Sequence, residues 1–221
     1  FPAFSEIQDQ PERLLKAFYS VSRLSTVLSF PAYAGLAMIA PEAVEVLFGE
    51  KWNSAVPVIQ ALALGGIIES LLSANACLIV AKGRPQWVLQ VQVARTAFAL
   101  AGILVAVRWG PAAVALAYSL SAYLIFPFQL RFVRRLIPVT ARGYITSIHG
   151  PLLASIFMVA CLLGSRIALA GMVPAAPFLI GSILLGALAY GGALWVADRR
   201  LPSELVDMLR SLQTAPELPD R

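Results

Sequence analysis

Charged residues and histidine are scarce in this sequence. Only 13% of its 221 residues are charged and one is a histidine, whereas about a quarter of the residues of an average soluble domain are charged. A single histidine cannot supply the paired acid and base of many membrane hydrolases and transferases, and no GxSxG, HExxH or glycine-rich phosphate-binding motif occurs. We therefore expect no catalytic residues, no metal ligands and no cofactor, and we predict that the protein is not an enzyme.

Cysteine is rare as well, with two residues in the chain. Cys77 and Cys161 lie inside apolar runs, where a small buried thiol is the ordinary role, and their spacing indicates neither a disulfide nor a metal site. The net charge is +5, but the basic residues cluster between apolar runs, which is a signal of membrane topology. This pattern excludes nucleic acid from the expected partners.

Long apolar runs are what the sequence has in quantity. Hydrophobic residues make up 59% of the chain and the mean hydropathy is +0.77, which predicts an all-α integral membrane protein with about six transmembrane helices. The predicted spans cover residues 24–40, 54–81, 88–107, 112–130, 152–170 and 176–196. Pro31 and Pro127 are expected to kink their spans, because proline lacks the N–H that bonds one turn back. Short surface or interfacial helices are predicted at residues 41–52, 137–149 and 205–212.

Residues 54–81 and 88–107 are predicted to form a transmembrane hairpin, joined by the turn at residues 82–85. Each run carries one charged residue, Glu69 in the first and Arg95 in the second. Counted from the turn, the two lie at depths that differ by roughly 3 Å in antiparallel helices. Because a charge at the bilayer centre costs at least ~2.5 kcal/mol, such residues usually pair or line a cavity.

Arg95 nevertheless has two interpretations. It pairs with Glu69 or lines a polar cavity, or else its long stem carries the guanidinium to the cytoplasmic headgroups, whose level Trp87 marks only eight residues earlier. Gln92 lies one turn before Arg95 on the same helix face. This neighbour favours a polar lining.

The basic residues also predict the orientation of the spans. Three of them, Lys51, Arg108 and Arg166, fall on one side of the predicted membrane and fourteen on the other. By the positive-inside rule, both ends of the chain then face the cytoplasm, and the tryptophans lie near the span ends as amphipathic indoles do. The fourteen are Arg13, Lys16, Arg23, Lys82, Arg84, Arg95, Arg131, Arg134, Arg135, Arg142, Arg199, Arg200, Arg210 and Arg221.

Three stretches follow one another in a recognisable order: PAFSEIQDQPERL at 2–14, FPAYAGLAMIAPEAVEVLFGEKW at 30–52 and AKGRP at 81–85. Their order and spacing resemble the C-terminal half of bacterial polysaccharide flippases, the O-antigen and exopolysaccharide exporters of the multidrug, oligosaccharidyl-lipid and polysaccharide (MOP) superfamily. The resemblance covers residues 1–136 in phrase and spacing, and the rest in hydropathy. It implies a MATE-like lobe, in a chain that begins at the cytoplasmic end of the eighth span and supplies spans nine to fourteen.

The same resemblance implies a division of the chain into three parts. Residues 1–136 are expected to form the core of the lobe, with a cytoplasmic entry segment and four transmembrane helices. Residues 137–200 add an interfacial helix and two further transmembrane helices. Residues 201–221 are expected to form a cytoplasmic amphipathic helix and a tail.

The function that the resemblance implies is transport. The chain is expected to be part of an inner-membrane flippase that moves an oligosaccharide on an undecaprenyl pyrophosphate carrier by alternating access, for lipopolysaccharide or exopolysaccharide biosynthesis. The implied partners are this lipid-linked oligosaccharide, membrane lipids, the N-terminal half of the same transporter, and a polysaccharide polymerase with its chain-length machinery. The residues expected to meet the substrate are Arg95, Gln92, Glu69, Arg23, Lys16 and Arg84.

Two other functions remain open at this point. One is a multidrug extruder coupled to Na⁺ or H⁺, in which Glu69 is a cation site. The other is a membrane polymerase or ligase of polysaccharide assembly. The second is disfavoured because such enzymes usually carry a large polar loop outside the membrane, and the longest outer segment here has only about a dozen residues.

Overall fold

The structure, a computed structural model, describes residues 11–169 and 172–197 of the chain. This part contains six α-helices and two short 3₁₀ helices, and no strand. All six α-helices are long and apolar enough to cross a membrane. The prediction of an all-α integral membrane protein is therefore confirmed. The elements are α2 (Pro11–Phe48), η1 (Glu50–Ala55), α3 (Val56–Ala81), α4 (Pro85–Ala106), η2 (Val107–Trp109), α5 (Pro111–Leu136), α6 (Ala141–Leu169) and α7 (Ala175–Ala197).

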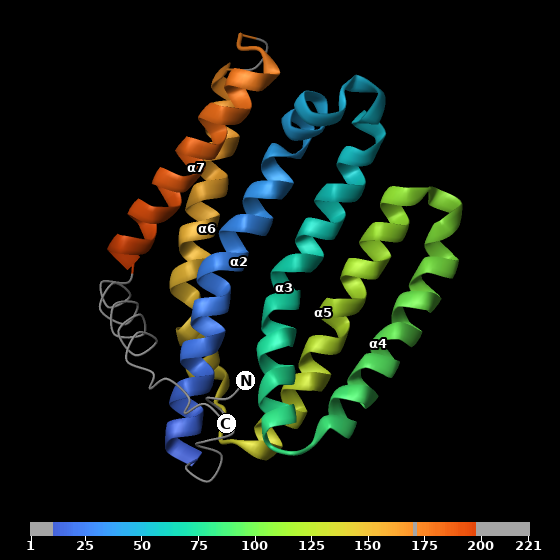
Figure 1. Cartoon of the computed structure of the whole chain (residues 1–221), viewed down its shortest axis with the longest axis vertical. Helices are drawn as coiled ribbons and strands as arrows, with labels where there is room; N and C mark the ends of the chain where they lie inside the picture. The colour runs from blue at the N-terminus through green and yellow to red at the C-terminus, as the bar shows by residue number, and fades with distance from the viewer. Residues whose placement is uncertain (1–10, 170–171, 198–221) are drawn as a thin grey trace, which may run out of the picture.

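The helices run side by side and alternate in direction (Figure 1). The start of α2, the α3–α4 turn and the α5–α6 connection lie at one end of the molecule, which we call the α3–α4 end. The α2–α3 and α4–α5 connections lie at the other end, the α2–α3 end. The predicted spans thus cross the molecule in the expected alternation.

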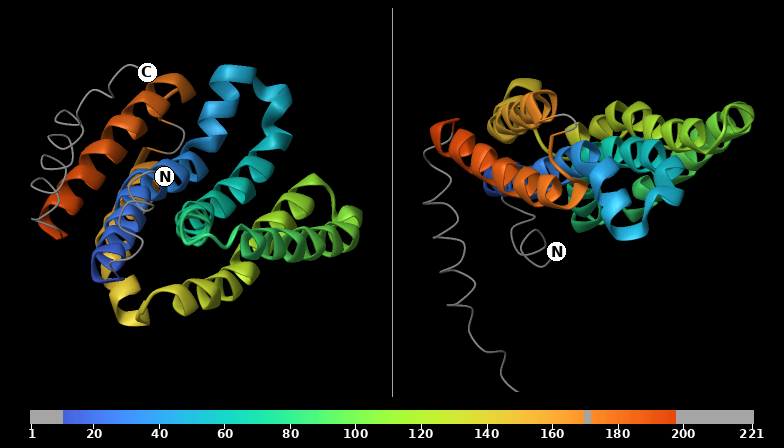
Figure 2. Two further views of the ribbon diagram at one scale, coloured as in Figure 1. Left: turned by 60° about the horizontal axis from the view of Figure 1, so that its bottom comes forward. Right: turned by 90° about the horizontal axis from the view of Figure 1, so that it is seen from above.

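Helix α2 is the centre of the arrangement. It packs against α3 on one side and against α6 and α7 on the other, while α5 packs between α3 and α4. Two further views separate these groups, with α3, α4 and α5 on one side of α2 and with α6 and α7 on the other (Figure 2). The helices therefore form two groups of three. One group is α2, α6 and α7, the other is α3, α4 and α5, and the groups meet where α2 packs against α3.

The predicted hairpin is confirmed, with its turn between α3 and α4. Gly83 has φ of +69°, a left-handed conformation that glycine adopts without strain, and Pro85 occupies the first turn of α4, where its missing N–H costs nothing. Beyond the turn the two helices diverge, and α4 packs mainly on α5 (Figure 1). Contact between α3 and α4 within the membrane-spanning part therefore depends on side chains that reach across.

Two of the predicted surface helices are not separate elements. Residues 41–48 continue α2 through Pro41, and residues 50–55 form η1. Residues 141–149 are the first turns of α6, which continues through Pro151. Both boundaries were predicted at a proline, but both helices continue. At Pro41 the freed carbonyl of Ala37 accepts a hydrogen bond from Gln60 of α3, as a neighbouring helix can supply in a membrane protein. The amphipathic helix predicted at residues 205–212 lies outside the described residues.

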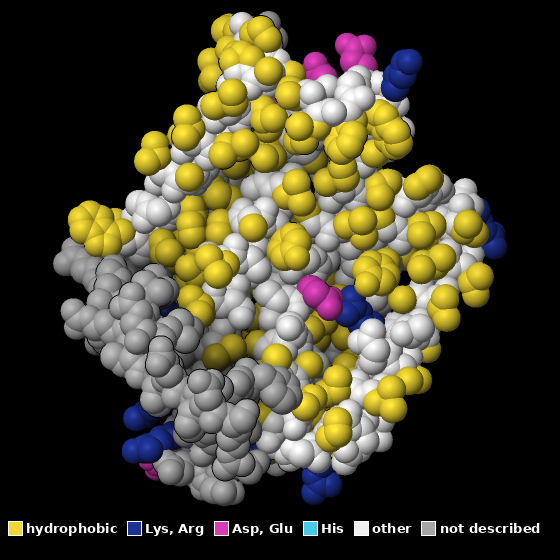
Figure 3. All heavy atoms as spheres, viewed as in Figure 1, with side chains coloured by type: hydrophobic (Ala, Val, Ile, Leu, Met, Phe, Trp, Pro, Cys, Tyr) yellow, Lys and Arg dark blue, Asp and Glu magenta, His cyan; other side chains and the backbone are white. Residues whose placement is uncertain are grey.

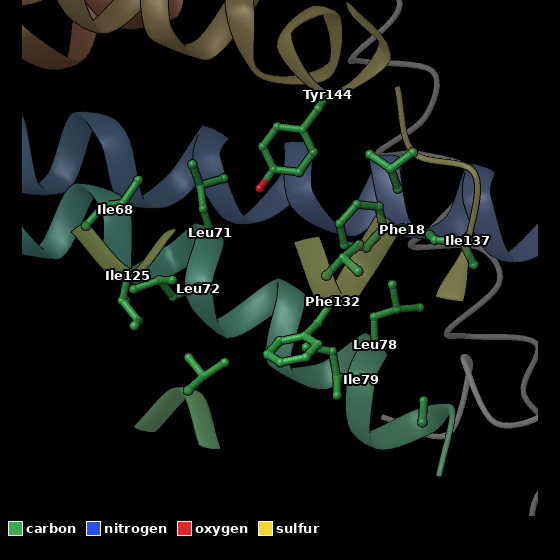
Figure 4. Packing of buried hydrophobic residues seen from close by; sticks show 14 of the residues in the cluster. Phe18, Ile68, Leu71, Leu72, Leu78, Ile79, Ile125, Phe132, Ile137 and Tyr144 are labelled. Atoms are coloured by element: carbon green, nitrogen blue, oxygen red, sulfur yellow. The ribbon is translucent and has the colours of Figure 1, made fainter. Parts of the chain in front are cut away.

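The largest apolar core lies toward the α3–α4 end, where α2, α3, α5 and α6 meet (Figure 4). Phe18 of α2 and Tyr144 of α6 have ring centroids 5.9 Å apart, and both are almost completely buried. Leu78 and Ile79 of α3 are fully buried beside them. This core packs the start of α6 against α2 of its own group and against α3 and α5 of the other group.

Candidate functional site

A salt bridge joins the middle of α3 to the middle of α4. Arg95 donates from Nη1 to Oε1 of Glu69 over 2.9 Å, and its Nη2 lies 2.8 Å from Oε2. Paired contacts of this kind are the strong form of an arginine–carboxylate interaction. The predicted similarity in depth is confirmed, and the guanidinium pairs with Glu69 rather than extending to the end of α4.

A residue of a third helix, α5, also contacts Arg95. The hydroxyl of Tyr118 on α5 lies 3.4 Å from Nη2 of Arg95, and the guanidinium carbon lies 5.4 Å from the centre of the Tyr118 ring. A cation over an aromatic face is attracted by the ring electrons, and more strongly where water is excluded. Arg95 therefore has two partners, one on each neighbouring helix.

The two members of the pair differ in exposure. The side chain of Arg95 is 10% exposed, whereas that of Glu69 is 47% exposed. Figure 3 shows an acidic and a basic side chain in contact in the middle of the molecule, on a face whose other charged side chains lie toward its periphery. The group presented at mid-depth is thus a carboxylate, held by a buried guanidinium.

Close packing of α3 fixes the position of this carboxylate. A Cβ placed on Gly65 would lie 2.5 Å from Oγ of Ser119, and one on Gly66 would lie 2.3 Å from the Tyr33 ring. The Ser119 hydroxyl also donates to the carbonyl of Ala61 over 2.7 Å. Gly65 and Gly66 are therefore close-packing sites of α3, and Glu69 follows them by one turn.

Comparison with known proteins gives three relatives. The lipopolysaccharide biosynthesis protein WzxC of Escherichia coli (strain K12) is 35% identical over 105 residues, which are 48% of this chain and 21% of that protein. The teichuronic acid biosynthesis protein TuaB of Bacillus subtilis (strain 168) is 32% identical over 84 residues, 38% of this chain and 17% of that protein. An uncharacterized membrane protein in the cps region of Klebsiella pneumoniae is 27% identical over 220 residues, 96% of this chain and 44% of that protein.

A family model described as "Polysaccharide biosynthesis protein" matches residues 1–57. The first part of the chain is thus similar to this polysaccharide biosynthesis family. The resemblance found in the sequence is thereby confirmed at the level of the family. The chain spans less than half the length of the curated relatives that it matches. The comparison with solved structures found no match.

The other predicted site residues lie away from the salt bridge. Gln92 is exposed on α4, one turn from Arg95. Arg84 is exposed at the start of α4, stacked over the Trp87 ring at 5.6 Å and about 16 Å of helix from Arg95. Lys16 is exposed and Arg23 half-buried on α2. The structure thus joins two of the six predicted residues directly, and whether any of them binds a substrate stays a prediction.

Sequence reasoning missed a second ion pair, toward the α2–α3 end. Arg166 of α6 donates from Nη2 to Oε1 of Glu42 on α2 over 2.5 Å, and its Nη1 lies 3.5 Å from the carbonyl oxygen of Met38. The pair borders a cavity of 430 Å³ that also includes Glu45 and Phe178. Its members are 124 residues apart, so that only the packing of α6 on α2 brings them together.

Tyr118 was also missed, because it lies in a run that reads as uniformly apolar. A tyrosine within a span, with a polar tip on an apolar ring, was the available signal. No group of three or more histidine, cysteine, aspartate or glutamate side chains that could hold a metal ion occurs within residues 11–169 and 172–197.

Proposed function

We propose that the chain is the C-terminal part of an inner-membrane flippase, which moves an oligosaccharide linked to undecaprenyl pyrophosphate by alternating access. The names of its relatives place two of them in the biosynthesis of lipopolysaccharide and teichuronic acid. Six helices that can cross a membrane and the scarcity of acid–base groups both suit transport without covalent chemistry. The proposal includes the cytoplasmic location of both chain ends.

The observation that carries the proposal is the exposed carboxylate of Glu69. This residue lies thirteen positions after the start of α3 and twelve before its end, which is the depth of the bilayer centre for a helix that spans it. A charge exposed to hydrocarbon at that depth is costly, so charged side chains inside spans normally face a cavity or another part of the protein. The face that bears Glu69 is therefore, in this proposal, the cavity face of the transporter.

The basic residues at the α3–α4 end give this cavity an entrance for an anion. Lys16 and Arg84 are exposed there, and Arg23 lies further along α2. Arginine and lysine attract phosphate groups, and the planar guanidinium matches phosphate oxygens best. We expect the pyrophosphate to enter past these residues. Because Arg95 is engaged by Glu69, a direct contact between Arg95 and the substrate requires this salt bridge to open.

A cation-coupled multidrug extruder is the second candidate, and the exposure of Glu69 is the observation that favours it. A half-exposed carboxylate inside a membrane protein can accept a proton or a sodium ion. The contact with Arg95 weighs against that use, because the guanidinium already balances the charge. The two functions differ in what the cell loses when the gene is deleted.

The test measures surface polysaccharide and drug susceptibility in a strain that lacks the gene and carries the full-length protein on a plasmid. Restored polysaccharide with unchanged drug susceptibility is the expected result. Restored drug resistance without any change in surface polysaccharide would favour the extruder and contradict the flippase.

A labelling experiment tests the orientation separately. Asn53 lies in η1 at the α2–α3 end, Gln86 lies at the start of α4, and both are exposed. In a background with all native cysteines changed to serine, Asn53→Cys should react with an impermeant thiol reagent added to whole cells, and Gln86→Cys should react only after lysis. The reverse pattern would contradict the proposed orientation.

A further inference from the structure

Helix α2 is 38 residues long and contains two internal prolines, Pro31 and Pro41. A proline has no backbone N–H, so the carbonyl four residues earlier loses its helical partner. The two carbonyls freed in this way belong to Val27 and Ala37. Inside a membrane an unpaired carbonyl is costly, and a donor from elsewhere is expected.

Both freed carbonyls receive a hydrogen bond from the side chain of another helix. The hydroxyl of Tyr190 on α7 donates to the carbonyl oxygen of Val27 over 2.7 Å. The amide nitrogen Nε2 of Gln60 on α3 donates to the carbonyl oxygen of Ala37 over 2.9 Å. The donors come from the two opposite flanks of α2 (Figure 1). Each of the two freed carbonyls of α2 is thus bonded to a different helix group.

The internal prolines of α5 and α6 provide a comparison with those of α2. Pro127 in α5 and Pro151 in α6 free the carbonyls of Tyr123 and Ser147. The serine hydroxyls near these prolines donate to other carbonyls of their own helices, Ser121 to Tyr118 and Ser147 to Tyr144. Interhelical donors to carbonyls freed by proline are thus seen at both internal prolines of α2.

Open grooves lie on both flanks of α2 near Pro31. An open cavity of 330 Å³ between α2, α6 and α7 is lined by Pro31, Gly35 and Tyr190 among others. A second cavity of 290 Å³ between α2, α3 and α6 is lined by Phe30 and Ala34. These grooves leave room beside Pro31 for the helix to change direction.

We propose that α2 bends at Pro31 and Pro41 and is a hinge helix of the transport cycle, and that Tyr190 and Gln60 are positioning residues that hold these two bends in the present conformation. This inference rests on the proposed function for the statement that the conformation changes during transport. When the helix groups move against each other, the two side-chain hydrogen bonds exchange partners, whereas the helical hydrogen bonds of α2 on either side of each proline stay intact. Prolines and inserted side chains are the usual causes of such bends.

The test is a double-mutant cycle in the full-length protein, using Tyr190→Phe and Pro31→Ala. Tyr190→Phe should lower polysaccharide export about threefold at unchanged protein amount, the size expected for one interhelical hydrogen bond in a membrane protein. Pro31→Ala should also lower export, because it restores a rigid helix. In the Pro31→Ala background, Tyr190→Phe should have no further effect, because the new backbone N–H supplies the bond to Val27.

Tyr123→Phe is the matched control. Its hydroxyl donates over 2.7 Å to the carbonyl oxygen of Leu64, in a helix turn that contains no proline. Its effect should therefore be the same with and without Pro31. The pair Gln60→Met and Pro41→Ala gives the same cycle at the second bend, and serves if a Pro31 variant fails to accumulate.

A second readout does not depend on the substrate. A cysteine replacing Gly35 borders the 330 Å³ cavity, and its Cβ has room, with Met158 Cε as the nearest atom at 3.7 Å. In purified protein without the native cysteines, Tyr190→Phe should raise the rate at which N-ethylmaleimide labels this position. The increase should disappear in the Pro31→Ala background.

Two results would overturn the hinge. One is full export by Pro31→Ala, which would show that the bend is not needed. The other is an equal effect of Tyr190→Phe on labelling with and without Pro31, which would show that the hydroxyl does not act through the Val27 carbonyl. A failure of the parent protein to restore any polysaccharide would count against the proposed function alone, because the labelling cycle still reports on the bend.

Discussion

The described part of the chain contains two ion pairs between helices, and they are opposite in character. In the Glu69–Arg95 pair the base is buried, at 10% side-chain exposure, and the acid is 47% exposed. In the Glu42–Arg166 pair the acid is more buried, at 14% against 34% for the base. The first links α3 to α4 in mid-helix, and the second links α2 to α6 toward the α2–α3 end.

Position decides what each exposure means. Arg166 lies three residues before the end of α6 and Glu42 six residues before the end of α2, so water or headgroups can reach this pair. Ion pairs in such places contribute about 0 to 1 kcal/mol. Glu69 lies in mid-helix, where hydrocarbon is the default surroundings, and its exposure therefore indicates a polar space or a protein partner in front of it. Exposure alone would have ranked both pairs as similar surface contacts.

The largest effect is expected when the acid of each pair is replaced by alanine. Glu69→Ala leaves the buried guanidinium of Arg95 with Tyr118 alone, and breaking a buried pair from one side typically costs about 3 to 5 kcal/mol. We expect a strong loss of both protein amount and polysaccharide export. Glu42→Ala, the matched variant, should leave both within about twofold, because water or headgroups reach this pair near the helix ends and such a pair contributes up to about 1 kcal/mol.

The charge-swapped protein completes this experiment. The double variant Glu69→Arg with Arg95→Glu should recover part of the export lost in either single alanine variant, because a paired charge in the membrane is better than an unpaired one. Immunoblotting of membranes and quantification of surface polysaccharide measure the two quantities. Strictly additive losses in the cycle would contradict coupling between the two residues.

The next largest effect is expected from alanine substitutions of a glycine near each pair, which test the packing around it. Gly66 precedes Glu69 by three residues, and an added Cβ would lie 2.3 Å from the Tyr33 ring. Gly164 precedes Arg166 by two residues, and an added Cβ there meets nothing within 4 Å. Gly66→Ala should lower the free energy of unfolding by about 1 to 3 kcal/mol, whereas Gly164→Ala should be neutral or raise it by up to about 1 kcal/mol.

Thermal unfolding of the purified protein in detergent measures both glycine variants. A Gly66→Ala protein as stable as the parent would show that α2 and α3 can separate at this point without loss. It would also remove the reason for treating the position of Glu69 as fixed by packing.

Much of this comparison was accessible from the sequence, for identifiable reasons. The hairpin and the common depth of Glu69 and Arg95 follow from hydropathy and from counting residues along a regular helix. The pair Glu42–Arg166 does not, because its members are far apart in the chain and only the tertiary packing of α6 on α2 joins them. The sequence also did not reveal that Arg95 is the buried member of its pair, because that depends on Tyr118 from a third helix.

The helix boundaries show the same limit. Pro41 and Pro151 are local signals for a helix start, and local reasoning placed boundaries there. In α2 the carbonyl that Pro41 frees is bonded by Gln60 from α3, a contact that no local pattern reveals. Tertiary hydrogen bonding thus overrides a backbone preference that is reliable in isolated helices.

The smallest effect is expected from Arg95→Lys, which changes the shape of the side chain but not its charge. Arg95 uses its planar fork twice, since it contacts both oxygens of Glu69 and lies over the Tyr118 ring. Lysine carries a compact charge on a flexible stem and cannot reproduce both contacts. Arg95→Lys should therefore lower polysaccharide export by a few fold while protein amount and topology stay unchanged.

Arg166→Lys provides the comparison, because Arg166 also contacts two groups, the Glu42 carboxylate and the Met38 carbonyl oxygen, but at a pair nearer the helix ends. Water can replace either contact there, so export should equal that of the parent. Surface polysaccharide in the complemented deletion strain, normalised to protein amount, measures both variants. Full export by Arg95→Lys would mean that only the charge at this position matters. Arg95 would then be a partner that neutralises Glu69 inside the membrane, and a phosphate-shaped contact at this depth would be excluded.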